Sequence, residues 1–229
     1  MGANADGELY HDKMIGMLEA IWGEGYLSPG GPDEVARLVG EDDLTGCSIL
    51  DIGCGAGGAV LLMADAFPNS RFVGYDISKY ALERAEHRRR EEGADNVRFV
   101  DPRDEPLPDD GSVDFVTTFD CIHDMTHPQE MIGAIDDALA PDGTWLLVDI
   151  KGRETFAENV EKNPMASLMY GISVLSCMSS ALSEPGGAGL GTLGLPASKA
   201  EEMASEAGFS RFRRLDIDHS VNSFYDIRV

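Results

Sequence analysis

The sequence predicts an α/β fold with a doubly wound, mainly parallel sheet of seven strands that ends in an antiparallel hairpin. Three observations predict it. Short apolar and β-branched runs alternate along the chain with helical patterns, as they do in βαβ units. A glycine-rich turn at 53–58 follows the first of these runs. Two final runs follow the last helical pattern, which favours a hairpin at one edge of the sheet.

The predicted elements follow one another in a regular order. Strands are expected at 49–52, 71–76, 97–100, 113–119, 144–150, 212–217 and 224–229. Helices are expected at 59–67, 79–92, near 128–139 and at 198–207. Ser78 precedes the second of these helices, where its hydroxyl can accept a hydrogen bond from a free amide of the first turn. Pro141-Asp142-Gly143 is expected to turn the chain into the fifth strand.

Two segments lie outside this skeleton. Residues 1–45 are predicted to form an N-terminal helical lid, and residues 46–229 the main domain with a cap insertion at about 151–197. Both segments are expected near the carboxyl ends of the strands, where ligands bind in open α/β sheets. Pro164–Ser180 is apolar on most sides, so as a helix it either roofs a pocket or forms a dimer contact. The glycine-rich stretch 186–191 fits a mobile loop or a plain linker equally well.

The charge balance limits the partners. The chain has 18 basic and 41 acidic residues among 229, a formal net charge of −23. Such a surface repels nucleic-acid phosphates, so no nucleic-acid partner is expected. Lysine is scarce while aspartate is abundant throughout, a composition that favours a halophilic source over an ordinary acidic enzyme.

The sequence also predicts where the protein works. Its polar, acidic beginning predicts no signal peptide, and no run reaches the roughly 18 apolar residues that a membrane span needs. The four cysteines have neither CxxC nor zinc-site spacing, so no metal site is predicted. The expectation is a cytoplasmic protein without a membrane partner, either a monomer or a homodimer.

The most informative stretch runs from Asp51 to Gly58, with the sequence Asp-Ile-Gly-Cys-Gly-Ala-Gly-Gly. It is typical of a buried strand, a tight turn and a helix N-terminus, where glycines leave no Cβ between backbone and ligand and free amides suit an anionic group. A nucleotide-like cofactor is therefore expected. The spacing also satisfies the dinucleotide fingerprint, but Asp51 would repel a pyrophosphate and could pair with an ammonium group.

This stretch resembles motif I of the class I S-adenosylmethionine (SAM) methyltransferases, and residues 47–229 resemble that family throughout. The resemblance implies a Rossmann-like fold, SAM as cofactor, and a ribose contact by Asp76, the acid that ends the second strand. Arg103 and Asp104 are the candidates beside the adenine amine. The implied cofactor-binding residues are Ser28, Gly30, Asp51, Gly53, Cys54, Gly55, Gly57, Asp76, Ile77, Arg103, Asp104 and Phe119.

Two narrower resemblances concern the acceptor. From Phe119 onward the chain resembles a bacterial and animal methyltransferase group that usually carries a winged-helix domain, which we do not expect here. Residues 10–31 are similar to the lid of phosphoethanolamine methyltransferases, where a tyrosine matching Tyr10 works with a histidine after the fourth strand. Asp124 stands at that histidine's position and His123 one residue earlier, while Asp120 matches the aspartate that meets the substrate amine. This shift, with few basic residues to hold a phosphate, argues against a phosphobase substrate.

The predicted function is methyl transfer from SAM to a small-molecule acceptor, which could be an amine, a thiol or a hydroxyl. Tyr10 and His123 are the candidates for proton handling, and Asp120 for orienting a cationic acceptor. One alternative is a SAM-binding regulatory protein without turnover. Another is an NAD-dependent oxidoreductase, which has no use for Asp51.

Overall fold

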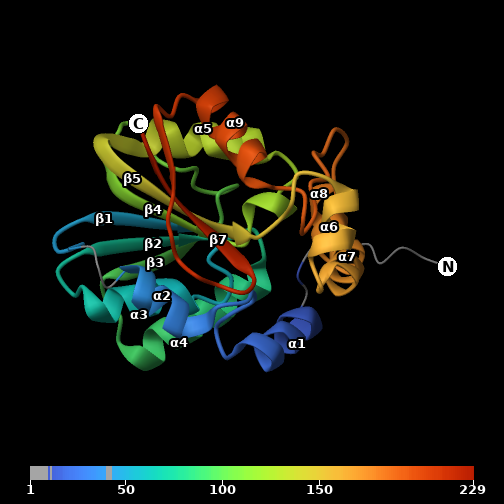
Figure 1. Ribbon diagram of the computed structural model, residues 1–229. Coiled ribbons are helices and arrows are strands. Elements are labelled where there is room, and N and C mark those ends of the chain that lie inside the picture. Colours follow the sequence, from blue (N-terminus) through green and yellow to red (C-terminus); the bar gives the residue numbers. More distant parts are fainter. Residues whose placement is uncertain (1–9, 11, 40–42) are drawn as a thin grey trace.

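A seven-stranded sheet in the order β3-β2-β1-β4-β5-β7-β6 forms the centre of the protein (Figure 1). The computed structural model describes residues 10, 12–39 and 43–229. The strands are β1 Ser48–Ile52, β2 Arg71–Tyr75, β3 Val97–Val100, β4 Val113–Phe119, β5 Leu139–Ile150, β6 Arg211–Arg214 and β7 Asn222–Arg228. The first five are parallel, whereas β7 runs antiparallel to both β5 and β6. The predicted fold class and the terminal hairpin are confirmed.

Helices cover both faces of this sheet. On one face lie α5 Pro128–Ala138 and α9 Ala197–Ala207, and on the other lie α2 Gly31–Val39, α3 Gly58–Ala66 and α4 Lys79–Glu92 (Figure 1). As predicted, Ser78 begins α4 by accepting a hydrogen bond from the Ala81 N–H at 3.3 Å. Two apolar cores, one on each side of the sheet, hold these layers together.

The remaining helices lie at the carboxyl edge of the parallel strands. They are α1 Asp12–Trp22 from the lid segment and α6 Phe156–Lys162, α7 Ala166–Leu175 and α8 Cys177–Ala181 from the cap insertion, with a 3₁₀ turn at Ile122–Asp124 after β4. Figure 1 shows α1 and the three cap helices beside the same edge of the sheet. Of the predicted lid, residues 1–9, 11 and 40–42 lie outside the described residues. In the described part of the chain, no helix has the length and apolar character to cross a bilayer.

The structure corrects three of the predicted elements. The Pro141-Asp142-Gly143 turn lies inside β5, because Leu139 already pairs with Val113 and the register then shifts before Thr144 pairs with Phe115. The extra residues form a bulge, one of the few strand settings that accept proline. The sixth strand ends at Arg214 rather than at 217.

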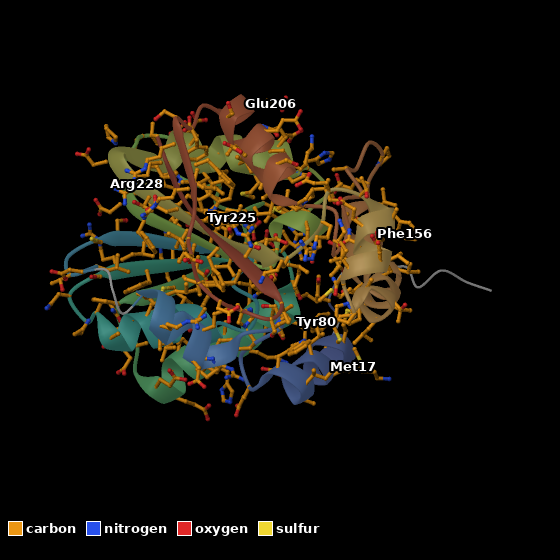
Figure 2. All side chains as sticks on the ribbon, in the orientation of Figure 1. Met17, Tyr80, Phe156, Glu206, Tyr225 and Arg228 are labelled. Carbon is orange, nitrogen blue, oxygen red and sulfur yellow. The ribbon has the colours of Figure 1, made fainter. Side chains whose placement is uncertain are left out.

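The third correction concerns Pro164–Ser180, which does not form one helix. The helix α7 ends at Leu175, and α8 begins only after Ser176, whose φ of −125° and ψ of −78° are not helical. The outer side of the cap is apolar: Phe156 points away from the protein (Figure 2) and is 68% exposed, and Leu175 is 76% exposed. The end of α8 and the residues just after it (180–184), rather than α7, contribute to the cavity described below.

Candidate functional site

A cavity of about 610 Å³ opens at the carboxyl ends of β1, β2 and β4. The loop between α1 and α2 forms one wall, and segment 180–184 forms another. The predicted site residues that line it are Tyr10, Ser28, Asp51, Gly53, Cys54, Gly55, Asp76, Ile77, Arg103, Phe119 and Asp120. Gly30, Gly57, Asp104 and His123, which were also predicted, are described but lie outside this lining.

The turn after β1 takes a backbone conformation that favours glycine. Gly53 and Gly55 have φ of 71° and 54°. The N–H groups of Gly53 and Cys54 donate to the Tyr75 carbonyl oxygen at 2.8 and 3.0 Å, which joins the turn to the end of β2. The Gly55 N–H donates to Asp76 Oδ2 at 2.9 Å, so the turn also fixes this carboxylate at the cavity wall.

Gly57 and Gly30 are glycines for reasons of packing. A Cβ on Gly57 would lie 2.8 Å from the Phe99 Cζ atom, and a Cβ on Gly30 would collide with the Glu34 carboxyl. Both residues also have positive φ, 85° and 112°. Their predicted role as cofactor contacts stays a prediction, because the packing alone explains why these positions lack a side chain.

Two buried aspartates flank the glycine turn. Asp51 Oδ1 accepts a hydrogen bond from the Thr117 hydroxyl at 2.7 Å, while its Oδ2 is buried without a donor. Burial raises the pKa of Asp51 to about 7. Burial also raises the pKa of Asp76, against the effect of the Ser78 and Gly55 N–H groups that donate to it. A buried oxygen without a donor suits a ligand that brings N–H groups.

Beside Asp76, the wall is formed by the segment after β3. Arg103 Nη2 donates to the Ile77 carbonyl oxygen at 2.7 Å and pairs with Asp101 Oδ2 at 2.5 Å. Asp104 is exposed and outside the lining. The carboxylate that orders this segment is therefore Asp101, which the sequence analysis did not single out.

The lid loop packs directly on the glycine turn. The Gly58 N–H at the start of α3 donates to the Gly25 carbonyl oxygen at 3.1 Å, and a Cβ on Gly55 would be only 3.0 Å from the Leu27 side chain. Glu19 of α1 pairs with Arg84 and with Arg88 of α4, the latter at 2.7 Å. These contacts close the cavity on the side of the lid.

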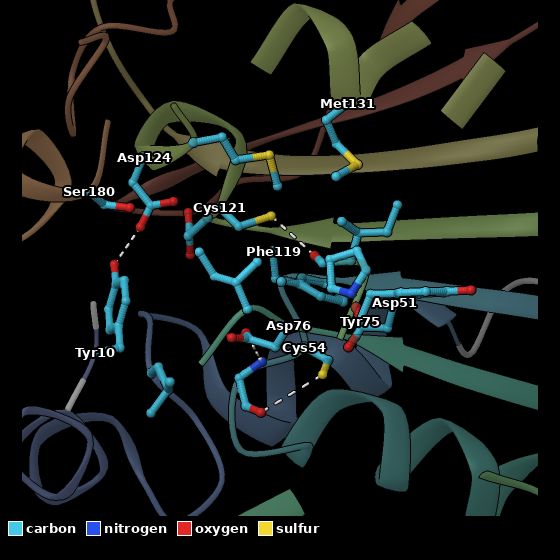
Figure 3. Close-up of a pocket in the computed structure, with 18 of the residues that line it drawn as sticks. Tyr10, Asp51, Cys54, Tyr75, Asp76, Phe119, Cys121, Asp124, Met131 and Ser180 are labelled. Carbon is cyan, nitrogen blue, oxygen red and sulfur yellow. Dashed lines mark hydrogen bonds between the residues drawn. The ribbon is translucent and has the colours of Figure 1, made fainter. Parts of the chain in front are cut away.

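Tyr10 reaches across the cavity to the turn after β4. Its hydroxyl donates a short hydrogen bond to Asp124 Oδ2, and the two side chains point toward each other in Figure 3. The Ser176 hydroxyl lies 3.4 Å from the same oxygen of Tyr10, so the break between α7 and α8 meets this pair. Burial, then the charge of Asp124, raises the pKa of Tyr10 well above its ordinary value, and burial raises that of Asp124 to about 6. At neutral pH Tyr10 is therefore the donor and Asp124 a carboxylate.

His123 lies behind the cavity wall. Its ring is buried, and Nδ1 lies 2.7 Å from Asp149 Oδ1, an atom that also accepts the Ile150 N–H at 2.7 Å. Burial lowers the pKa of His123, but the charge and hydrogen bond of Asp149 outweigh it and raise that pKa well above the ordinary value. His123 therefore contacts β5 and the cap, and its role in proton handling stays a prediction.

Backbone strain marks two of the predicted catalytic residues. Among the described residues, the non-glycine residues with positive φ are Tyr10 at 53° and Asp120 at 52°. Such conformations cost about 1–3 kcal/mol and persist where the surrounding structure enforces them, most often at functional sites. The Asp120 N–H donates to the Val148 carbonyl oxygen at 2.9 Å, and Asn222 Nδ2 donates to its Oδ2 at 3.2 Å. Its Oδ1 has no donor.

The end of the cavity away from the glycine turn, which we call the far end, is lined by more acidic than basic side chains. Glu130 and Glu184 line it with Asp120 and Asp124. The only basic lining side chains in the described part of the chain are Arg103, paired with Asp101, and His127, whose Nε2 lies 3.6 Å from Glu184 Oε2. Within the same described ranges, no group of three or more His, Cys, Asp or Glu side chains is placed to hold a metal ion.

Comparison with known proteins agrees with this architecture. Residues 43–193, about two thirds of the chain, match the family described as methyltransferase domain. The chain belongs to this family. It is 31% identical over 141 residues to phosphoethanolamine N-methyltransferase 2 of Caenorhabditis elegans, covering 60% of this chain and 32% of that protein. It is 28% identical over 172 residues to a malonyl-[acyl-carrier protein] O-methyltransferase of Paenibacillus, covering 71% and 55%.

Solved structures show the same fold. Phosphoethanolamine N-methyltransferase 2 of Haemonchus contortus, in complex with phosphomonomethylethanolamine and S-adenosylhomocysteine, superimposes with a TM-score of 0.68 at 25% identity, over 90% of this chain and 44% of that one. A SAM-dependent methyltransferase from Aquifex aeolicus superimposes with a TM-score of 0.61 at 18% identity, over 86% and 90%. This methyltransferase-domain chain thus spans about a third of the nematode relative's length and less of the matching plant enzymes.

Three residues of this site region escaped the sequence analysis. Glu34 and Asn222 are both buried and contact each other at 3.3 Å, and Asp149 holds His123. For Asp149 a signal existed, because it is an acid near the end of an apolar strand, and that end lies at the ligand-binding edge of the sheet. For Glu34 and Asn222 no local signal existed, since they come from opposite ends of the chain.

The burial of Asp51 predicts a pH-dependent stability. A carboxyl whose pKa is raised in the folded state stabilises the fold only at low pH, and this stability is lost as pH rises through about 7. In the ligand-free protein, the unfolding free energy should therefore fall between pH 6 and pH 8. In Asp51→Asn, which lacks the titrating carboxyl, this fall should be smaller by about 1 kcal/mol. Urea unfolding at the two pH values measures this, with exposed Asp110→Asn as the control. An unchanged fall in the Asp51 variant would contradict the assignment.

Proposed function

We propose that this chain catalyses methyl transfer from SAM to a small-molecule amine that carries no phosphate. The observation that carries the proposal is the joint lining of one cavity by the glycine turn, the Tyr10–Asp124 pair and the unpartnered Asp120 oxygen. The nematode relative is named as a methyltransferase of phosphoethanolamine, which supports an amine acceptor.

The residues present fit SAM. Asp51 Oδ2, buried without a donor, would accept from the cofactor's amino group, and the Asp76 carboxylate would accept from the ribose hydroxyls. Leu27 and Tyr26 of the lid loop would exclude water from that end. When bound, SAM supplies a methyl group on a positively charged sulfur, and its departure from that sulfur needs no acid.

The acceptor chemistry follows from the charges of the far wall. Carboxylates attract a cation, and Asp120 Oδ1 is free to accept from an ammonium group and to orient its nitrogen. A phosphate would need a free cation, whereas Arg103 and His127 already face carboxylates. These contacts favour a plain amine over a phosphorylated one. They also favour it over a thiol or a hydroxyl, which would gain little from an acidic wall.

The amine nitrogen must lose a proton before it can take a methyl group. Asp124, ionised above about pH 6 and bonded to the Tyr10 hydroxyl, is the group placed to hold that proton. The Tyr10 hydroxyl could accept the amine proton only if it passed its own proton to Asp124. The two residues therefore act as one unit.

The proposed setting follows from composition. The net charge of −23 supports a protein from a halophilic source that has no nucleic-acid partner, and we propose a cytoplasmic setting for it. The exposed apolar side of the cap is compatible with a monomer and with a homodimer.

Calorimetry with SAM, S-adenosylhomocysteine and NAD tests the cofactor, and S-adenosylhomocysteine release with amine, thiol and hydroxyl acceptors at high salt tests the reaction. We expect binding of the first two ligands and turnover with amines. Binding of NAD without SAM would overturn the proposal in favour of an oxidoreductase. Binding of SAM without turnover on any acceptor class would favour a regulatory SAM-binding protein.

Removing the proton-handling pair should slow the reaction without weakening cofactor binding. We expect Tyr10→Phe and Asp124→Asn each to lower kcat by about 10²–10⁴-fold, because either change breaks the pair. In Asp124→Asn the rise of kcat near pH 6 should also disappear. Steady-state kinetics and SAM calorimetry measure both effects.

Tyr170→Phe, outside the cavity lining, is the matched control and should keep the parent kcat. His123→Ala tests the other predicted proton carrier. Because its ring lies behind the wall, we expect a smaller loss of kcat than in Tyr10→Phe. A larger loss in His123→Ala, with wild-type rates in the two pair variants, would transfer the role to His123.

A further inference from the structure

Three buried oxygen atoms without a hydrogen-bond donor belong to residues that contact one another behind the far end of the cavity. They are Asp120 Oδ1, Glu34 Oε2 and Asn222 Oδ1, on residues at most 9% exposed. We call these three residues the carboxyl cluster. Native proteins leave few buried polar atoms unsatisfied, so three such acceptors on residues in contact indicate a guest that brings donors.

Printed contacts join the cluster into one unit. The Asn222 side-chain amide donates to Asp120 Oδ2 at 3.2 Å and to Glu34 Oε1 at 3.3 Å, so both of its protons are used. Asp149 lies outside this cluster, because its side chain is on the sheet face of its partner Ser223, whereas Asn222 is opposite Ile150 on the other face. The charges of Asp149 and Glu34 both act on Asp120. Asp120 connects the cluster to the cavity, which it lines.

The groups around the cluster supply too few donors for the two carboxyls of Asp120 and Glu34 to be ionised together. From the loop before β7, His219 Nδ1 accepts the Asn222 N–H at 2.8 Å, so the proton of this neutral ring is on Nε2. Nε2 lies 3.4 Å from Glu34 Oε2, in a geometry that makes no hydrogen bond. Burial, Arg37 and Lys151 lower the pKa of His219, against the charge of Asp218. Arg37 of α2 and Ser28 of the lid loop lower the pKa of Glu34 and Asp120, and His123 faces Asp149 and Asp120, with Asp124 beside it.

The balance of these effects still favours protons on the empty cluster. Burial raises the pKa of Glu34 to about 7 and, with Asp149 and Glu34 nearby, that of Asp120 well above its ordinary value. A proton on a carboxyl turns an acceptor into a donor and so relieves the shortage. The charge of Glu34 raises the pKa of Asp120, so these two carboxyls act together rather than as independent acids.

We infer that the carboxyl cluster is a proton-exchanging receptor for the cationic end of the acceptor. While empty it holds a proton, and when an ammonium group binds at Asp120 Oδ1 that proton leaves to the solvent. No covalent bond forms or breaks other than the carboxyl O–H, and the cluster gains one negative charge opposite the ligand's positive charge. This inference rests on the proposed amine substrate and adds Glu34 and Asn222 as positioning residues for Asp120.

The structure explains why Glu34 occupies this site. Its carboxyl lies where a Cβ of Gly30 would be, so only glycine at that position admits it. Glu34 thereby places a second carboxyl near that of Asp120. Asn222 lies between the two carboxyls and donates a hydrogen bond to each. Neither residue lines the cavity, so their effect on the ligand passes through Asp120.

Calorimetry with propylammonium as the probe tests the exchange, on protein saturated with S-adenosylhomocysteine and in buffers of different ionisation enthalpy. We expect release of about one proton per ligand at pH 7, and a Kd that falls by up to about tenfold per pH unit between pH 6 and pH 8. 1-Propanol, which has the same number of non-hydrogen atoms but is neutral, should release none. Binding of propylammonium without proton release, or no binding at all, would overturn the inference.

Variants separate charge from shape. Glu34→Gln keeps the side chain's size but removes its charge, so Asp120 loses its proton at lower pH. Propylammonium should then bind several-fold more tightly at pH 6 with less than half the proton release. A purely structural role of Glu34 would instead weaken binding, and that result would contradict us.

Asp136→Asn is the matched control. Asp136 also has a buried oxygen without a donor and a pKa raised by burial, but it lies on α5 beside Gly208 and outside the cavity lining. We expect unchanged proton release in this variant. If the enzyme releases S-adenosylhomocysteine with amine acceptors while propylammonium binding is proton-neutral, the inference fails and the methyl-transfer proposal stands. If SAM itself does not bind, both fail.

Discussion

The site depends on one geometric constraint: parallel strands end at the same edge of a sheet. Four neighbouring parallel strands each carry an aspartate at that end, namely Asp51, Asp76, Asp120 and Asp149. The fold therefore concentrates negative charge in a buried place, where each carboxylate needs a donor or a proton. The glycine turn, Thr117 and Asn222 supply some donors, and ligands would supply the rest.

This concentration of carboxylates explains the division of the cavity. At the glycine turn, backbone amides satisfy Asp76 and leave one oxygen of Asp51 open. At the far end, Asp120 is held in a strained backbone conformation with one oxygen open. The lid and the cap meet above both ends through Tyr10 and Ser176. The same arrangement that costs stability in the empty protein offers two separate places for N–H donors.

Much of the fold could be predicted from sequence because its signals are local. The runs of β4 and β3 and the capped helix α4 match their predicted bounds residue for residue. The β5 bulge and the break at Ser176 were missed because tertiary partners decide them: Val113 for the first, and the neighbourhood of Tyr10 for the second. The glycine turn, which we propose as the cofactor side of the site, could be predicted for the same local reason.

The acceptor side could be predicted only in part. Asp120, Tyr10 and Asp124 stood out by resemblance, but Glu34 and Asn222, 188 positions apart, meet only in the folded chain. Sequence also could not tell that His123 turns toward Asp149 rather than into the cavity. Which residues share a cavity is a property of packing, and motif spacing does not contain it.

The most direct test of the central claim, that converging carboxylates select a plain amine, compares ethanolamine with phosphoethanolamine as acceptors. The measurement is kcat/KM from S-adenosylhomocysteine release under identical conditions. The account predicts a value at least about tenfold higher for ethanolamine, since the phosphate would meet Asp120, Glu130 and Glu184 with no free cation among the described lining residues. A higher value for phosphoethanolamine would contradict it.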